Sequence, residues 1–478
     1  MNSDATFHNM FPPTQKSASF GLGYRCAYMD TARAKPFTCY GLMVGTDTTY
    51  NPVKTSNIAV RMIPRVLASL ALLMGLAGVI APRGSYLARA RNAAAPPRLS
   101  SVVHRTNGYQ IGAYYFSGWA HGQNDNLSPL LTNSPLRRYE PLIGWYDDSQ
   151  RQVDRTIAQA ADAGIDFFAF DWYDVGRSPY LSDQKLDEGI GYYLRSARRN
   201  RLNFCINFVD QEPFLPRPRD WPRLVRRWLA YFLQPDYVRV DGKPLFVVFN
   251  PERMRLIFKN SAGVHTALSY LRAQARKVGL PGVTVAVTTR LTATYNPGSI
   301  GRLVAEGYDV ATGYNYHLLG GEKPGVAAPY AALVAENTAM WDRIGQHVPL
   351  PYIPVVTSGW DQRFDQRQYR HAVFYSGRTS AAFACYAAAA RRWIDDNPTQ
   401  AVPEKIALVY AWNEIGEGGA IIPNHTDGYA YTTALRNAFT APLAPSCLTP
   451  RAIALTKTSP VPRAIAIQQA PLHAKIGE

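Results

Sequence analysis

The sequence predicts an α/β protein that forms a single catalytic (β/α)8 barrel of the TIM type, and three observations favour this fold. Short apolar runs alternate with amphipathic runs eight times between residues 110 and 439. The short runs are apolar almost throughout, as expected for parallel strands that are covered on both faces. The first run leads into the aromatic segment IGAYYFSGWAHG. A doubly wound open sheet, which is the alternative fold, would usually carry a glycine-rich phosphate loop there.

The eight predicted strands and eight predicted helices follow one another along the chain. The strands are residues 111–117, 166–173, 203–209, 244–250, 283–289, 310–316, 353–358 and 406–412. The helices are residues 148–163, 183–199, 221–233, 263–278, 300–306, 330–345, 379–395 and 427–439. Eight such units in one chain favour a closed barrel ringed by helices.

Residues 62–95 show the pattern of a secretory signal or signal anchor. Arg61 and Arg65 precede the apolar run 66–81, and small residues such as Ala88 and Ala90 follow it. At 16 residues the run is short for a spanning helix, but it is a possible membrane anchor. A buried core helix is the alternative, although the run has no polar face. We therefore expect a secreted, periplasmic or envelope-associated protein.

The segments outside the predicted barrel lack the alternation of apolar and amphipathic runs. Residues 1–61 have no sustained apolar period, so we expect them to be unstructured or to precede a true start at Met62. Residues 96–109 read as a basic linker. Residues 440–478 are rich in proline and alanine and are predicted to be disordered.

The positive charge of the chain lies mainly in these outer segments. Of the formal net charge of +16, residues 1–105 contribute +9 and residues 440–478 contribute +3, which leaves +4 for residues 106–439. A nucleic-acid partner would require a basic surface on the folded domain. We therefore do not expect a nucleic-acid partner.

The five cysteines do not suggest a metal site or a disulfide framework. They are Cys26, Cys39, Cys205, Cys385 and Cys447, with no CxxC pair and no HExxH motif. Cys205 and Cys385 lie in apolar runs and are predicted to be buried thiols. The sequence offers no metal or cofactor motif.

The last predicted strand leads directly into two glutamates. The apolar run 406–411 is followed by Trp412, Asn413, Glu414 and, three residues later, Glu417, with glycines close by. In a barrel of this class, catalytic groups lie where strands emerge at their carboxyl ends. The plainer interpretation is a polar loop that carries two solvated glutamates.

The other strand ends carry aromatic and amide side chains. This mixture suits a carbohydrate, because sugar faces stack on aromatic rings while hydroxyls pair with carboxylates and amides. The alternative is that these aromatics merely close the barrel. The predicted substrate-binding residues are Tyr115, Trp119, Asp171, Trp172, Asn207, Asn250, Tyr316, Trp360, Trp412 and Asn413.

Three motifs give the chain a family resemblance over residues 112–439. They are GAYYFSGW, GWYDDSQRQVDRTIAQAADAGIDFFAFDWY, and AWNEIGEGG followed by Asp427, Gly428 and Tyr429. With these motifs the chain resembles glycoside hydrolase family 99 and the family 99-like (WbsX-like) proteins of polysaccharide gene clusters. The resemblance implies a (β/α)8 barrel and endo-action on α-mannose-like linkages. The sequence departs from the family pattern at Ile415 and Gly416, where bulkier residues are usual.

The resemblance also implies roles for the two glutamates. Glu414 would act as base on the 2-hydroxyl of the substrate through an anhydro-sugar, and Glu417 would be the general acid and then the base for water. As an acid, Glu417 needs a raised pKa, while Glu414 is expected to be held ionised by hydrogen bonds. We therefore predict a glycoside hydrolase that acts on an α-linked polysaccharide. The alternatives are a polysaccharide-biosynthesis protein, transferase-like or processing, and a carbohydrate-binding barrel without catalysis.

Overall fold

The computed structural model describes residues 104–119, 139–146, 149–179, 185–289, 298–317, 322–364, 372–442 and 447. The expected unstructured segment 1–61, the signal 62–95 with its apolar run, most of the linker 96–109 and nearly all of the tail 440–478 lie outside these residues. None of the helices in the described part of the chain is long and apolar enough to cross a membrane.

Eight parallel strands form the centre of the molecule, and all eight lie within the predicted ranges or start one residue before them. They are β1 (Gln110–Tyr115), β2 (Phe167–Trp172), β3 (Asn203–Phe208), β5 (Lys243–Val248), β6 (Thr284–Thr288), β7 (Val310–Thr312), β9 (Val355–Thr357) and β11 (Ile406–Tyr410). The strand order is β7-β6-β5-β3-β2-β1-β11-β9, with the short β4 (Arg239–Val240) antiparallel to β5.

The sheet closes between its two outer strands. Ala311 in β7 forms a parallel bridge with Tyr352, just before β9. The amide of Ala311 donates to the carbonyl of Pro351 over 2.8 Å, and the amide of Ile353 donates to the carbonyl of Ala311 over 2.9 Å. The closed parallel barrel is therefore confirmed, and the doubly wound sheet is excluded.

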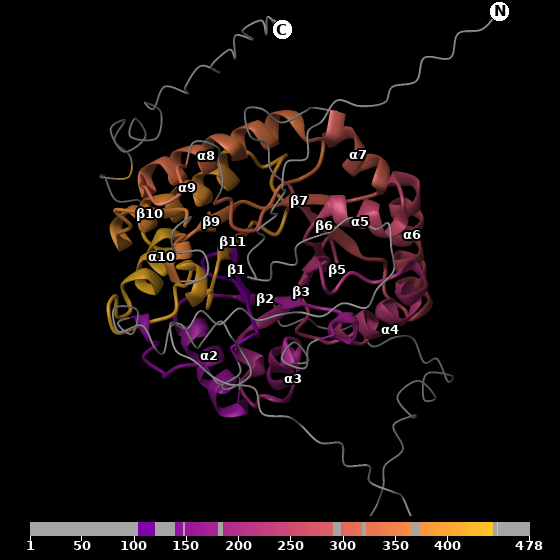
Figure 1. Ribbon diagram of the computed structural model, residues 1–478, viewed down its shortest axis with the longest axis horizontal. Coiled ribbons are helices and arrows are strands. Elements are labelled where there is room, and N and C mark those ends of the chain that lie inside the picture. Colours follow the sequence, from indigo (N-terminus) through magenta and orange to yellow (C-terminus); the bar gives the residue numbers. More distant parts are fainter. Residues whose placement is uncertain are drawn as a thin grey trace, which may run out of the picture. The chain divides into compact units, whose positions relative to one another are not determined.

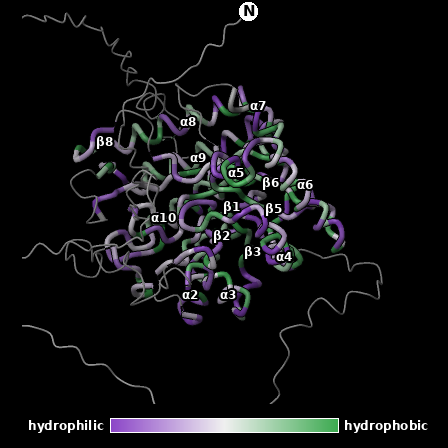
Figure 2. The backbone as a smooth tube through the Cα atoms, turned by 45° about the vertical axis from the view of Figure 1, so that its right-hand side comes forward, coloured by the Kyte–Doolittle hydropathy of each residue, from purple (hydrophilic) through white to green (hydrophobic). Residues whose placement is uncertain are grey.

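Helices surround the barrel in chain order (Figure 1). The long ones are α2 (Gln150–Asp162), α3 (Glu188–Arg195), α4 (Trp221–Phe232), α6 (Ser261–Lys277), α7 (Gly298–Glu306), α8 (Tyr330–His347), α9 (Ser380–Asp396) and α10 (Ala430–Thr440). Several begin at a polar side chain that caps the first turn, such as Ser149, Asn260 and Thr379. Figure 2 shows hydrophobic residues along the central strands and mixed hydropathy along the helices.

Several elements were not predicted. Helix α5 (Pro251–Phe258) follows β5, and β8 (Ala327–Pro329) pairs in parallel with β10 (Phe374–Ser376) in a separate small sheet. This second sheet lies outside the barrel order. It forms part of the wall of the pocket described below.

One prediction about the cysteines is wrong. Cys385 in α9 is not a free thiol but forms a disulfide with Cys447, 62 residues further along the chain. Cys447 is buried, so the predicted disorder of the tail does not hold at this residue. Cys205 is a buried free thiol as predicted, and its burial raises the pKa of the thiol.

Candidate active site

The alternation of side chains along β2 separates residues that lie in the barrel from residues that face the helices. Phe167, Ala169 and Asp171 share one face, because every second side chain of a strand points the same way. A side chain at Gly112, the partner of Phe167 in β1, would collide with the Phe167 ring, so this face is the crowded barrel interior. Asp171 is the last of the three and lies at the carboxyl end of the strand.

Asp171 is held by the neighbouring strand. It pairs in register with Asn207 of β3, whose Nδ2 donates to Asp171 Oδ1 over 2.8 Å. Both side chains are buried. The structure thus brings these two predicted site residues together, with Asn207 supporting Asp171.

A tyrosine links Asp171 to the first glutamate of the loop. The Tyr314 hydroxyl lies 2.7 Å from Asp171 Oδ2 and 3.2 Å from Glu414 Oε1. A phenol has one proton to donate. Both contacts are hydrogen bonds only if one carboxyl group carries a proton and donates it to the phenol oxygen. Asp171, Tyr314 and Glu414 therefore form a chain that can share one proton.

The electrostatics agree with this shared proton. Burial raises the pKa of Asp171 to about 7, although the hydrogen bonds from Asn207 and Tyr314 lower it. Burial, followed by the charges of Glu417 and Asp171, raises the pKa of Glu414 well above its ordinary value. Desolvation thus outweighs the single hydrogen bond from Tyr314, and the pKa of Glu414 moves in the direction opposite to the one expected from hydrogen bonding.

Glu417 ends the short 3-10 helix η8 (Ile415–Glu417) and is held differently. Tyr410, the last residue of β11, donates its hydroxyl to Glu417 Oε2. The carbonyl of Glu417 accepts the amide proton of Asp361 over 2.7 Å. A hydroxyl that donates to a carboxylate favours its ionised form.

The three carboxylates belong to one cluster. Burial raises the pKa of Tyr173 well above its ordinary value, and the charges of Asp171, Glu414 and Glu417 raise it further. The rings of Tyr314 and Tyr410 meet edge to face at 4.9 Å between them. This arrangement of several acids around phenols in a buried barrel mouth suits proton transfer to and from a bound molecule.

The turn that carries the glutamates is fixed by its neighbours. The Asn413 side chain accepts the amide of Phe116 over 2.9 Å and donates to the Phe116 carbonyl over 2.7 Å. Trp119 Nε1 donates to the Asn413 carbonyl over 2.9 Å. Trp119 and Asn413, both predicted to bind substrate, thus hold the loop in place.

Gly416 gives the loop room against Trp119. A Cβ at this position would lie 3.1 Å from the indole ring. A bulkier side chain would therefore have to displace the indole or the loop. The departure from the family pattern at Gly416 thus has a packing reason in this chain.

Three predicted sugar-binding aromatics lie instead between the barrel and the helices. Trp172 is 1% exposed, and its ring meets Trp228 of α4 at 5.4 Å with the Arg227 guanidinium 4.8 Å above it. Tyr115 and Trp412 are fully buried. Tyr115 and Trp172 project from the outer face of their strands, and the Trp412 ring packs on Phe168 of that same face. In this arrangement the three rings pack within the protein, so contact with substrate stays a prediction for them.

The remaining predicted residues have local roles. Asn250 caps α5 by accepting the amides of Glu252 and Arg253 with its side-chain oxygen, so that oxygen is engaged in the helix start. Tyr316 is buried and shares a hydrogen bond of 2.8 Å with the Tyr352 hydroxyl. These hydrogen bonds join Asn250 to α5 and Tyr316 to Tyr352, and not to the carboxylate cluster.

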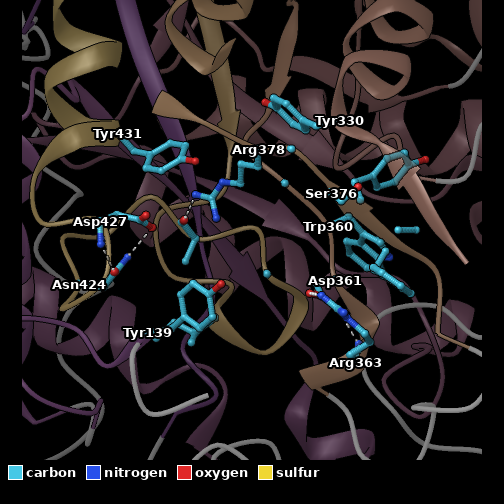
Figure 3. Close-up of a pocket in the computed structure, with 18 of the residues that line it drawn as sticks. Tyr139, Tyr330, Trp360, Asp361, Arg363, Ser376, Arg378, Asn424, Asp427 and Tyr431 are labelled. Atoms are coloured by element: carbon cyan, nitrogen blue, oxygen red, sulfur yellow. Dashed lines mark hydrogen bonds and ion pairs between the residues drawn. The ribbon is translucent and has the colours of Figure 1, made fainter. Parts of the chain in front are cut away.

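Trp360 occupies the boundary between the cluster and a neighbouring pocket. Its ring stacks on His317 at 3.6 Å between centroids and lies 6.2 Å from the ring of Tyr410. It also lines a cavity of about 420 Å³, together with Ile415 and Gly418 of the glutamate loop. Figure 3 shows Trp360 at one side of this cavity and Tyr431 at the other.

The cavity and the carboxylate cluster are thus adjacent but distinct. We place the chemistry at the cluster, because the carboxylates there are buried and hydrogen-bonded to phenols. Within the described ranges, there is no group of three or more His, Cys, Asp or Glu side chains that could hold a metal ion.

Sequence reasoning missed Tyr314 and Tyr410 as site residues. Both follow from strand alternation: Tyr410 comes two residues after Leu408, which projects into the barrel toward Gly112. Tyr114, an interior residue of β1, meets Tyr314 across the barrel with rings 4.7 Å apart. A consistent count of every second residue would have favoured these phenols over Tyr115.

Fold and site define the class of protein: a (β/α)8 barrel with a cluster of acids and phenols at the carboxyl ends of its strands. The chain belongs to the family described as glycosyltransferase WbsX, whose model matches residues 139–435. This confirms the WbsX-like resemblance that the sequence motifs predicted. No curated protein sequence matches the chain.

Several solved structures are similar to the chain. One, described as a glycoside hydrolase-like protein, has 16% identity and a TM-score of 0.50, covering 71% of this chain and 96% of its own. Two structures of the GH99 endo-alpha-mannosidase from Bacteroides thetaiotaomicron have 14% identity. Their TM-scores are 0.44 and 0.42, with coverage of 69% and 70% of this chain and 95% and 99% of theirs. At 16% identity, the similarity to the glycoside hydrolase-like protein shows a shared fold.

Proposed function

We propose that this protein is a glycoside hydrolase that cleaves an α-linked, mannose-like polysaccharide with Glu414 and Glu417. The observation that carries the proposal is the buried cluster at the barrel mouth, where Tyr314 joins Glu414 to Asp171 and Tyr410 holds Glu417. Solvated loop glutamates would have no such partners. The GH99 resemblance of the motifs and the structural neighbours suggest the sugar class.

In the first step, Glu414 takes the proton of the substrate 2-hydroxyl as that oxygen bonds to the anomeric carbon. The glycosidic bond breaks, and Glu417 gives its proton to the departing oxygen. This yields the anhydro-sugar that the family resemblance implies. In the second step, Glu417 takes a proton from water as water attacks the anomeric carbon. Glu414 then returns its proton to the 2-oxygen, so both acids regain their initial states.

The shared proton reconciles the base role of Glu414 with its raised pKa. When the proton lies on Asp171, the Tyr314 hydroxyl is free to donate to Glu414, which is then ionised and oriented. Asp171 is suited to hold this proton, because its pKa is raised to about 7. Asp171 and Tyr314 are thus positioning residues for the base. Asn207 in turn orients Asp171.

For Glu417 to start as an acid, it must carry a proton when the substrate is bound. A bound sugar that covers the loop would raise the pKa of any carboxyl group beneath it by desolvation. Trp360, which lies between the glutamate loop and the pocket, is the aromatic residue that we propose to contact this sugar.

A glycan-assembly role is the second candidate, since the family is described as a glycosyltransferase. The two reactions differ in what they need. Release of reducing ends from α-mannan, or from the host's own polysaccharide, in water alone supports hydrolysis. Product formation only with a nucleotide-sugar donor would overturn hydrolysis and support transfer.

We also propose that the protein is exported, secreted or held at the envelope through residues 66–81. The signal-like segment supports this proposal, and so does the Cys385–Cys447 disulfide, because disulfides persist mainly in oxidising compartments. N-terminal sequencing of the native protein tests it. A mature chain that begins near residue 96 supports cleavage, whereas an intact chain confined to the cytoplasm would contradict export.

A further inference from the structure

The cavity next to the glutamate loop contains an arginine that is positioned from several sides. Arg378 follows β10, and its Nη2 donates to the Ala420 carbonyl over 2.9 Å. Its guanidinium lies 3.9 Å from the centre of the Tyr431 ring. A Cβ on Gly359 would lie 3.0 Å from Arg378 Cδ, so the stem of the arginine fills the space that the glycine leaves. Figure 3 shows the guanidinium at the centre of the pocket.

The charge of Arg378 has no carboxylate partner within the residues that the structure describes. The two acids that line the same cavity are engaged elsewhere: Asp361 pairs with Arg363 over 2.7 Å, and Asp427 accepts from Asn424 over 3.2 Å. A guanidinium has five N–H donors, and Arg378 uses one of them in a hydrogen bond to a described residue. The remaining donors on the two Nη atoms and the positive charge can therefore serve a ligand, whereas Nε is buried.

The cavity lies next to the carboxylate cluster. It is lined by Ile415 and Gly418, which flank Glu417 in the chain, and by Trp360, whose ring approaches Tyr410. A volume of about 420 Å³ is of the size that holds a small-molecule ligand. In the proposed function, a sugar chain held at Glu414 and Glu417 extends past Ile415 and Gly418 into this cavity.

We propose that this cavity is a subsite for an acidic sugar, in which Arg378 binds the carboxylate of a hexuronic acid unit. This inference rests on the proposed function and names the substrate class more closely. A planar carboxylate matches the paired donors of a guanidinium. The diphosphate of a nucleotide sugar fits less well, because Asp361 and Asp427 in the same wall would repel a doubly charged group.

The test measures binding by calorimetry at low salt. The probes are trigalacturonate and a glucuronate-containing hyaluronan tetrasaccharide, each beside its carboxyl-reduced counterpart. The proteins are wild type, Arg378→Gln, Arg378→Lys and, as a matched loss of one charge outside the pocket, Arg436→Gln. We expect at least one acidic probe to bind wild type. Arg378→Gln should weaken that binding about 10- to 100-fold, as loss of hydrogen bonds to a charged group does. Binding of the reduced probes should be unchanged.

Arg378→Lys keeps the charge but loses the paired donors, so intermediate affinity is expected even if Arg378→Gln folds poorly. Equal binding of acidic and reduced probes, the same loss in Arg436→Gln, or tighter binding of GDP-mannose than of both acids would overturn the acidic subsite. Because binding is measured rather than turnover, the result is separate from hydrolysis. Binding through Arg378, with no release of reducing ends from α-mannan or the host's own polysaccharide, would keep this inference and overturn the proposed function instead.

Discussion

The single proton of Tyr314 connects two carboxyl groups that would otherwise repel each other. The hydroxyl lies 2.7 Å from Asp171 and 3.2 Å from Glu414, and burial raises the pKa of both acids. Interacting groups of this kind titrate as a pair and not as single residues. The residue that decides the behaviour of the proposed base is therefore Tyr314, which lies two residues after the end of β7 and bears no charge of its own.

Replacement of Tyr314 by Phe tests this link. The variant keeps the ring but removes the bridge, so we expect kcat to fall about 10- to 100-fold with a smaller change in KM. In wild type, activity should fall above about pH 7, where Asp171 loses the shared proton. The variant should show this alkaline limb displaced, because Asp171 and Glu414 then titrate separately. A lower kcat with an unchanged pH profile would indicate a merely structural tyrosine.

Asp171 also makes a prediction about stability. Its pKa is raised from 3.8 to about 7 in the folded protein, so its contribution to stability is present below about pH 4 and is lost as the pH rises through about 7. Asp171→Asn removes this loss. We expect the variant to have a higher Tm than wild type at pH 8 and a similar Tm near pH 4. The gain in the free energy of unfolding at pH 8 has a ceiling of about 4 kcal/mol. A gain or loss of the same size at both pH values would contradict the raised pKa.

At the scale of single elements, β2 shows why the site was only partly predictable. The run FFAFDW correctly predicted a buried strand, and its position predicted that the end would face the active side. Asp171 and Trp172, adjacent in sequence, were both assigned to the substrate. A strand places neighbours on opposite faces, so only Asp171 reaches the barrel interior.

The two tryptophans predicted to bind sugar should therefore behave differently. Trp172→Ala removes a ring packed on Trp228 and should lower the free energy of unfolding by about 3–5 kcal/mol, while the affinity of the folded fraction for substrate stays within about twofold. Trp360→Ala should weaken substrate binding by about 1–3 kcal/mol. Chemical unfolding and calorimetric binding on both variants separate the two effects. A large loss of affinity in Trp172→Ala would contradict its assignment to the core.

The start of helix α5 shows that a polar residue at a strand end can have a structural role. The position of Asn250 at a strand end predicts a sugar ligand, but Asn followed by Pro251 is also a common helix start. The structure shows the cap, with the amides of Glu252 and Arg253 donating to the side chain. The same residue type at a strand end can bind a ligand or cap a helix. Here the Asn-Pro pair already indicates a helix cap.

At the scale of the whole molecule, the barrel was predictable and the links outside it were not. Eight strands could be located because each is a short apolar run between amphipathic helices. The Cys385–Cys447 disulfide could not, because pairing depends on the distance between two segments 62 residues apart. The β8–β10 sheet and the Arg378 pocket also depend on long-range packing.

The disulfide should stabilise the whole domain. Cys385→Ser opens a loop closed over a separation of 62 residues, and we expect the free energy of unfolding to fall by about 2–4 kcal/mol. Reductant should lower the unfolding midpoint of wild type to nearly that of the variant and leave the variant unchanged. Equal midpoints for oxidised wild type and variant would contradict a stabilising disulfide.

The most direct test of the central claim compares leaving groups in Glu417→Gln. The substitution keeps the size of the side chain but removes its proton. If Glu417 is the general acid, turnover of an unactivated α-mannoside should fall at least about 100-fold, whereas a glycosyl fluoride, which needs little protonation, should be spared in the bond-breaking step. Glu414→Gln should impair both substrates, because its role concerns the anomeric centre. Equal small effects of both variants on both substrates would contradict the account and return Glu414 and Glu417 to ordinary loop residues.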